Sequence, residues 1–87
     1  MKIKSGFMLR KVAGKQVVVP VGKATLDFNG MITLNDSGAI LWNCLLAGAE
    51  VEDMIAALQE VYDVDDATAR ASIDAFINRL KEADLFE

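Results

Sequence analysis

The chain has 87 residues, 53% of them apolar, which predicts a single small domain (residues 1–87) that is stabilised by packing. A single cysteine, Cys44, and no histidine exclude an internal disulfide bond and a zinc site of the Cys/His kind. The net charge is −4, with no signal-peptide pattern and no stretch near the ~20 apolar residues of a membrane span, so we expect a cytoplasmic protein with no membrane partner.

Two β-rich runs open the chain and predict a hairpin. Residues 6–12 and 16–22 are rich in β-branched and other apolar side chains, and Ala13-Gly14-Lys15 separates them. Gly14 can supply the positive φ that a tight hairpin turn requires. Pro20 cannot donate to a β-ladder, so it predicts either the end of the second strand or a bulge.

A third strand is expected before the first helix. Residues 23–28 (KATLDF) are expected to continue the second strand as a bent strand that leads into an Asn29-Gly30 turn, the strongest two-residue hairpin signal. Residues 31–34 (MITL) then form a short strand. A strict two-residue turn would pair Asp27 with Ile32, an acid beside a core residue, so the register before the turn stays open.

Three helices are predicted after the strands. Asn35 suits the N-cap of the first, an almost wholly apolar helix that Gly48 can end, and Asp65 suits the N-cap of the third. The predicted apolar stripes are Val51, Met54, Ile55, Leu58, Val61 and Tyr62 in the second helix, and Ala69, Ile73, Phe76, Ile77 and Leu80 in the third. The order β-β-β-α-α-α predicts a winged-helix-like α+β fold with a three-stranded antiparallel sheet.

Charge is divided unevenly along the chain. Residues 1–30 carry a balance of +5 and residues 31–87 a balance of −9. One interpretation is two kinds of solvated surface. The other is a pair of partner surfaces, one drawn to acidic groups and one to basic groups.

The sequence offers little chemistry for catalysis. No histidine can activate a serine, no Gly-rich phosphate loop occurs, and the pairs Glu52-Asp53 and Asp65-Asp66 open helices, where capping and the helix dipole explain them. We therefore expect no enzyme activity, no catalytic residue, no cofactor and no metal. A winged-helix nucleic-acid binder is a weak alternative, because residues 65–84, its recognition helix, carry a net charge of −2.

A peptide- or protein-binding module remains. The edge of the strand at residues 31–34 can offer unpaired N–H and C=O groups to a guest strand, and the third helix is the expected pocket wall. On that helix Ile73 and Ile77 lie to one side of the core line, beside Arg70 and Asp74. Two alternatives stay open: both isoleucines are simply core residues, or the edge strand forms a homodimer.

Three segments carry a resemblance to a known family: VVVPVG, NGMITLNDSGAILWNCL and YDVDDATARASIDAFINRLKEADLF. A hydrophobic strand enters a Leu-Asn-Asp-Ser-Gly helix start at residues 34–38, a tryptophan follows one turn later, and the chain closes on Leu-Lys-Glu-Ala-Asp-Leu. On these segments, which span essentially the whole chain, the sequence resembles the PqqD family, named after coenzyme PQQ synthesis protein D.

The resemblance implies a recognition element for ribosomally made, post-translationally modified peptides. Such a protein is a non-catalytic chaperone that binds the leader of a precursor peptide and presents it to a modifying enzyme, often a radical S-adenosylmethionine (SAM) protein. The leader extends the sheet between the third strand and the third helix. The implied peptide-binding residues are Met31, Ile32, Thr33 and Leu34 in the strand, and Arg70, Ile73, Asp74 and Ile77 in the helix. The resemblance names neither the peptide nor the product, PQQ included.

Overall fold

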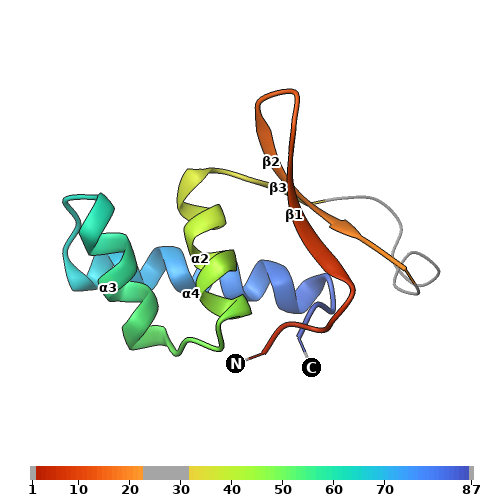
Figure 1. Cartoon of the computed structure of the whole chain (residues 1–87). Helices are drawn as coiled ribbons and strands as arrows, with labels where there is room; N and C mark the ends of the chain where they lie inside the picture. The colour runs from red at the N-terminus through yellow and green to blue at the C-terminus, as the bar shows by residue number, and fades with distance from the viewer. Residues whose placement is uncertain (1, 23–31, 87) are drawn as a thin grey trace.

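Three antiparallel strands are followed by three helices, which confirms the predicted α+β class and element order (Figure 1). The computed structural model describes residues 2–22 and 32–86. The elements are β1 (Phe7–Val12), β2 (Lys15–Pro20), β3 (Ile32–Leu34), α2 (Asp36–Leu46), α3 (Val51–Val61) and α4 (Asp66–Glu82). Within these ranges no helix is long and apolar enough to cross a membrane.

The β1–β2 hairpin turns over two residues. Val12 pairs with Lys15, so Lys15 belongs to the strand and the loop is Ala13-Gly14 alone. Their φ values are 52° and 80°, and two positive φ values in a two-residue loop are typical of the type I′ turn that suits twisted strands. The prediction for Gly14 is confirmed, whereas the left-handed conformation of Ala13 has no sequence signal because alanine rarely adopts it.

Strand β3 lies at one edge of the sheet. The strand order is β1-β2-β3, and β3 pairs with β2 from Gln16↔Leu34 to Val18↔Ile32. No other strand in the described part of the chain pairs with the outer edge of β3. The predicted strand at residues 23–28, the Asn29-Gly30 turn and Met31 all lie outside the described residues.

Helix α2 begins directly after β3 because Asn35 caps it. The Asn35 side chain accepts from the backbone N–H of Gly38 at 2.8 Å and from the Ser37 hydroxyl at 3.0 Å, so the predicted cap is confirmed. The helix ends where Gly48 adopts a φ of 81°, as predicted.

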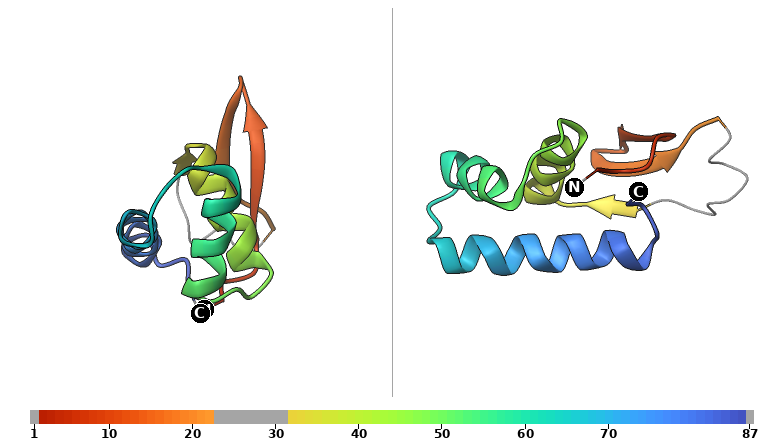
Figure 2. Two further views of the ribbon diagram at one scale, coloured as in Figure 1. Left: turned by 90° about the vertical axis from the view of Figure 1, so that its left-hand side faces the viewer. Right: turned by 90° about the horizontal axis from the view of Figure 1, so that it is seen from below.

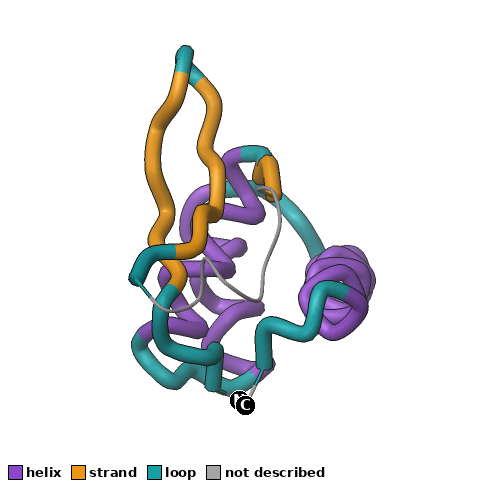
Figure 3. The backbone as a smooth tube through the Cα atoms, turned by 90° about the vertical axis from the view of Figure 1, so that its right-hand side faces the viewer, coloured by secondary structure: helices purple, strands orange, loops and turns teal. Residues whose placement is uncertain are grey.

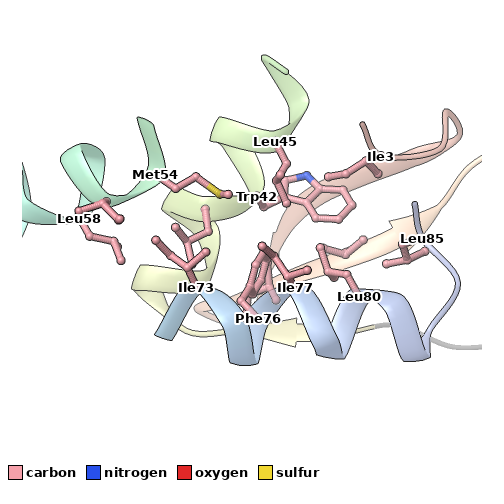
Figure 4. Close-up of a cluster of buried hydrophobic side chains, with 14 of the residues drawn as sticks. Ile3, Trp42, Leu45, Met54, Leu58, Ile73, Phe76, Ile77, Leu80 and Leu85 are labelled. Atoms are coloured by element: carbon pink, nitrogen blue, oxygen red, sulfur yellow. The ribbon is translucent and has the colours of Figure 1, made fainter. Parts of the chain in front are cut away.

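The core lies between α2, α3 and α4 and reaches the inner face of the sheet (Figure 4). Trp42 stands at its centre with 0% of its surface exposed. All five predicted stripe residues of α4 are buried, as are Met54, Ile55 and Leu58 of α3. Val61 is 61% exposed, so its assignment to the α3 stripe is wrong: it belongs to the last turn of the helix, beyond the buried contacts.

The two ends of the described chain lie side by side (Figure 1). Ile3 forms an antiparallel bridge with Phe86, and the Lys4 backbone N–H donates to the Leu85 carbonyl at 2.8 Å. The Lys4 ammonium also donates to Asp84 at 2.9 Å. The N-terminal segment is thereby fastened beside the end of α4.

Candidate functional site

Alternate side chains of β3 point toward the core. Leu34 is 4% exposed and Ile32 is half-buried, and both belong to the core side of the sheet, whereas Thr33 between them is exposed. This alternation anchors the strand through two side chains. Its outer edge therefore presents backbone N–H and C=O groups to whatever lies beyond it.

Gly38 brings the end of β3 close to α4. A Cβ atom placed on Gly38 would lie 3.0 Å from Asn35 Oδ1, 3.3 Å from Leu34 Cβ and 3.5 Å from Phe76 Cε1. Three elements therefore meet at this residue: the end of β3, the first turn of α2 and the middle of α4. A side chain here would push them apart, which explains why the Leu-Asn-Asp-Ser-Gly sequence ends in glycine.

Helix α4 runs past the open side of β3. The right panel of Figure 2 shows the strand and the helix with nearly parallel axes and opposite chain directions. Figure 3, in which α4 is seen end-on, shows β1 and β2 on one side of β3 and α4 on the other. The sheet edge and the helix therefore flank the same strip of surface.

Two adjoining hollows lie along α4, beside the N-terminal end of α2. The first, here the α3–α4 hollow, has a volume of about 360 Å³, with an apolar floor and a polar rim. Its lining is Leu58, Tyr62, Val64 and Ala69, with Asn35, Asp36, Ser37 and Ser72 at the rim. A hollow with this lining is suited to apolar groups of a ligand.

The second, here the α2–α4 hollow, has a volume of about 290 Å³. It is lined by Asn35, Ser37, Gly38 and Leu41 of the α2 side and by Ser72, Ala75, Phe76 and Arg79 of α4. The two hollows share Asn35, Ser37 and Ser72, so they form one continuous groove that follows α4.

The four α4 residues predicted to bind peptide lie away from this groove. Ile73 is 0% exposed and Ile77 is 7% exposed, so both side chains pack in the core. Arg70 donates to Glu52 of α3 at 2.6 Å, and this hydrogen bond raises its pKa. Asp74 is exposed, and none of the four lines either hollow.

Sequence reasoning missed the α4 flank that does line the groove. Ser72, Ala75, Phe76 and Arg79 follow the spacing i, i+3, i+4 and i+7, which places them on one helical face beside the core stripe. That spacing was visible in the sequence. What was missing is the packing of α4, which decides which of its two flanks faces β3.

The chain has one thiol, that of Cys44. Burial raises the pKa of the Cys44 thiol, and the nearby negative charge of Asp53 raises it further, so Cys44 stays protonated and weakly nucleophilic at neutral pH. Among residues 2–22 and 32–86, no cluster of His, Cys, Asp and Glu side chains could hold a metal ion. The groove offers instead an open strand edge, two hollows and a few polar groups.

Two solved structures share this fold. "TbiB1 in Complex with the TbiA(beta) Leader Peptide" matches with a TM-score of 0.78 and 22% identity, covering 100% of this chain and 95% of that one. "Lasso peptide synthetase B1 complexed with the leader peptide" matches with a TM-score of 0.73 and 23% identity, covering 93% and 89%. At these identities the likeness shows the fold alone. A comparison with curated proteins gave no match.

Fold and site together define a class: small α+β proteins with a three-stranded antiparallel sheet whose short edge strand faces a grooved helix. The family model for "Coenzyme PQQ synthesis protein D (PqqD)" matches residues 15–85. The chain belongs to the PqqD family, which confirms the resemblance seen in its sequence.

Proposed function

We propose that this protein is a non-catalytic adaptor of the cytoplasm that binds the leader segment of a ribosomally made precursor peptide. The leader adds as a strand to the outer edge of β3, and the adaptor presents it to a modifying enzyme. The observation that carries the proposal is the outer edge of β3, which no other strand within residues 2–22 and 32–86 pairs, near a groove on α4. Family membership and two structural neighbours solved with leader peptides support it.

The energetics require both the edge and the hollows. Three strand residues can give a guest about three main-chain hydrogen bonds, each with a net worth of ~0.5–1.5 kcal/mol. Micromolar affinity needs about −8 kcal/mol. Burying one large apolar side chain contributes ~1.5–3 kcal/mol, so one side chain in each hollow supplies most of the difference.

The proposed contact residues follow the groove. On the strand they are Ile32, Thr33 and Leu34, acting through their main chain, with Met31 kept from the sequence as a prediction outside the described residues. On the helix they are Ser72, Ala75, Phe76 and Arg79. Arg70, Ile73, Asp74 and Ile77 line neither hollow and stay a prediction from the sequence.

The enzyme partner is the remaining part of the proposal. Family resemblance favours a radical S-adenosylmethionine protein, encoded together with the adaptor and a short precursor peptide. Neither the peptide nor the final product is assigned. The competing hypothesis, a homodimer through the β3 edge, uses the same main-chain groups and therefore excludes peptide binding at that edge.

Titration of the leader half of a neighbouring precursor peptide tests the proposal. Backbone amide signals of residues 32–38 and 69–79 should shift, while those at the Ala13-Gly14 hairpin turn should stay. Single N-methylation along the bound peptide should weaken affinity at every second residue, because alternate N–H groups point toward the β3 edge. Shifts elsewhere, or no alternation, would overturn strand addition. Concentration-dependent mass without peptide would favour the homodimer.

A further inference from the structure

Two of the described residues that line the groove are charged. Asp36 lines the α3–α4 hollow and Arg79 lines the α2–α4 hollow, and every other described residue that lines either one is apolar or neutral. A peptide in the groove therefore meets one negative side chain in the α3–α4 hollow and one positive side chain in the α2–α4 hollow.

The guanidinium of Arg79 is not engaged in an ion pair within the described chain. The two ion pairs there join Lys4 to Asp84 at 2.9 Å and Arg70 to Glu52 at 2.6 Å. Compensation of the α4 dipole explains a cation in the last turn, but Lys81 occupies the same turn and lines neither hollow. What distinguishes Arg79 from Lys81 is its place in the groove.

The rise of α4 gives the distance from the α3–α4 hollow to Arg79, which can be expressed as a number of peptide residues. From the middle of the Ala69–Ser72 turn to Arg79 the helix rises about 13 Å at ~1.5 Å per residue. An extended strand advances ~3.3 Å per residue, so about four peptide residues cover that length. The separation between the two peptide side chains must also be an even number of residues, because only alternate side chains of a strand face the same side.

The strand direction sets the order of those residues. Both pairs in the sheet are antiparallel, and β3 runs opposite to α4 (Figure 2, right). A guest antiparallel to β3 therefore runs in the same direction as α4. Its N-terminal part reaches the α3–α4 hollow first, and its C-terminal part reaches Arg79.

We infer that Arg79 is a specificity-determining residue that selects leaders with an acidic side chain four residues after a large apolar one. This inference rests on the proposed function. The apolar side chain fills the α3–α4 hollow, and the carboxylate pairs with the Arg79 guanidinium. Asp36 lines the other hollow, where it repels the acid of a peptide laid in the reverse direction, so the two charges also favour one orientation.

Selection from a displayed library of random peptides tests the inference without knowledge of the natural leader. The full chain is used as wild type, as Arg79→Glu and as the matched control Lys81→Glu, with folding checked by circular dichroism. Wild type and Lys81→Glu should enrich a large apolar residue followed four positions later by Asp or Glu. Arg79→Glu should enrich Lys or Arg at that position instead.

A second measurement uses one enriched peptide and the milder variant Arg79→Gln. Replacing the peptide's acid by its amide should lower affinity for wild type about two- to fivefold, the range of a partly exposed ion pair, and leave affinity for Arg79→Gln unchanged. Enrichment of apolar peptides without the acid, or the same enrichment for Arg79→Glu, would overturn the inference and leave the proposed function standing. Failure to enrich any peptide that competes at the β3 edge would overturn both.

Discussion

The two edges of the sheet are built in opposite ways. The β1 edge is six residues long and carries Arg10 and Lys11, both exposed, whereas the β3 edge is three residues long and carries no charged side chain. Charged side chains on an edge strand discourage pairing with a second chain, so the β1 edge has a charge protection that the β3 edge lacks. The difference supports the proposal that a guest strand adds to β3 rather than to β1.

The strands are also anchored differently, which predicts the largest effect. Leu34→Ala in β3 removes a side chain that is 4% exposed and should cost about 2–5 kcal/mol of unfolding free energy. Met8→Ala in β1 is the matched control at 44% exposure and should cost well under that. Urea denaturation followed by circular dichroism measures both. Equal losses would mean that β1, too, is fixed by its buried contacts.

The link between the open edge and α2 predicts the next effect. Asn35→Ala removes the acceptor of the Gly38 N–H and should cost about 1 kcal/mol, in the usual range for an N-cap. Because Asn35 also lines both hollows, peptide affinity should fall along with stability. Asp65→Ala removes the α4 cap outside the groove, so it should lower stability with affinity unchanged. Parallel denaturation and titration calorimetry separate the two.

Exchanging the charge of the two edges tests the comparison directly. Thr33→Lys adds a charge to the open edge and should weaken a bound leader up to about fivefold, the scale of a cross-strand pair. Replacing Arg10 and Lys11 by threonine unprotects β1 and should produce a concentration-dependent increase in mass by light scattering. If the double variant stays monomeric, positive charge is not what closes the β1 edge.

The smallest expected effect is a difference in acid sensitivity between the N-terminal turns of α2 and α4. The hydrogen bond from Thr68 lowers the pKa of Asp65, so this carboxylate stabilises the folded state above its unfolded pKa of about 3.9. That contribution is lost as the pH falls through the lowered value. Amide exchange near pH 3 should rise in the first turn of α4 before that of α2, whose cap is uncharged. Asp65→Asn should remove the pH dependence of α4.

Local signals in the sequence were sufficient to predict the helix ends, the hairpin turn and the order of the elements. Asn35 and Asp65 act as caps and Gly48 ends a helix because capping depends on a few neighbouring residues. The hairpin at Gly14 and the order of elements follow from the same short-range chemistry. The family assignment rests on those same segments, since they fix the strand-to-helix junction.

The face of α4 that lines the groove could not be predicted in the same way. Ile73 and Phe76 are both apolar and three residues apart, and only the packing of α4 against α2 and α3 decides that Phe76 reaches the groove while Ile73 stays sealed. Arg70 and Arg79 present the same difficulty: one is bound to Glu52 of another helix and the other lines a hollow. Such differences depend on residues distant in sequence, which no local pattern contains.

The bridge between Ile3 and Phe86 holds the two ends of the described chain together. Figures 1 and 3 place both ends at the side of the molecule opposite β3. A linker joined to either end, or to both, would leave the open strand edge unobstructed. The domain is thus suited to being carried on a larger enzyme by a tether. A short tether of this kind would hold a captured leader at about millimolar effective concentration and turn its delivery into an intramolecular step.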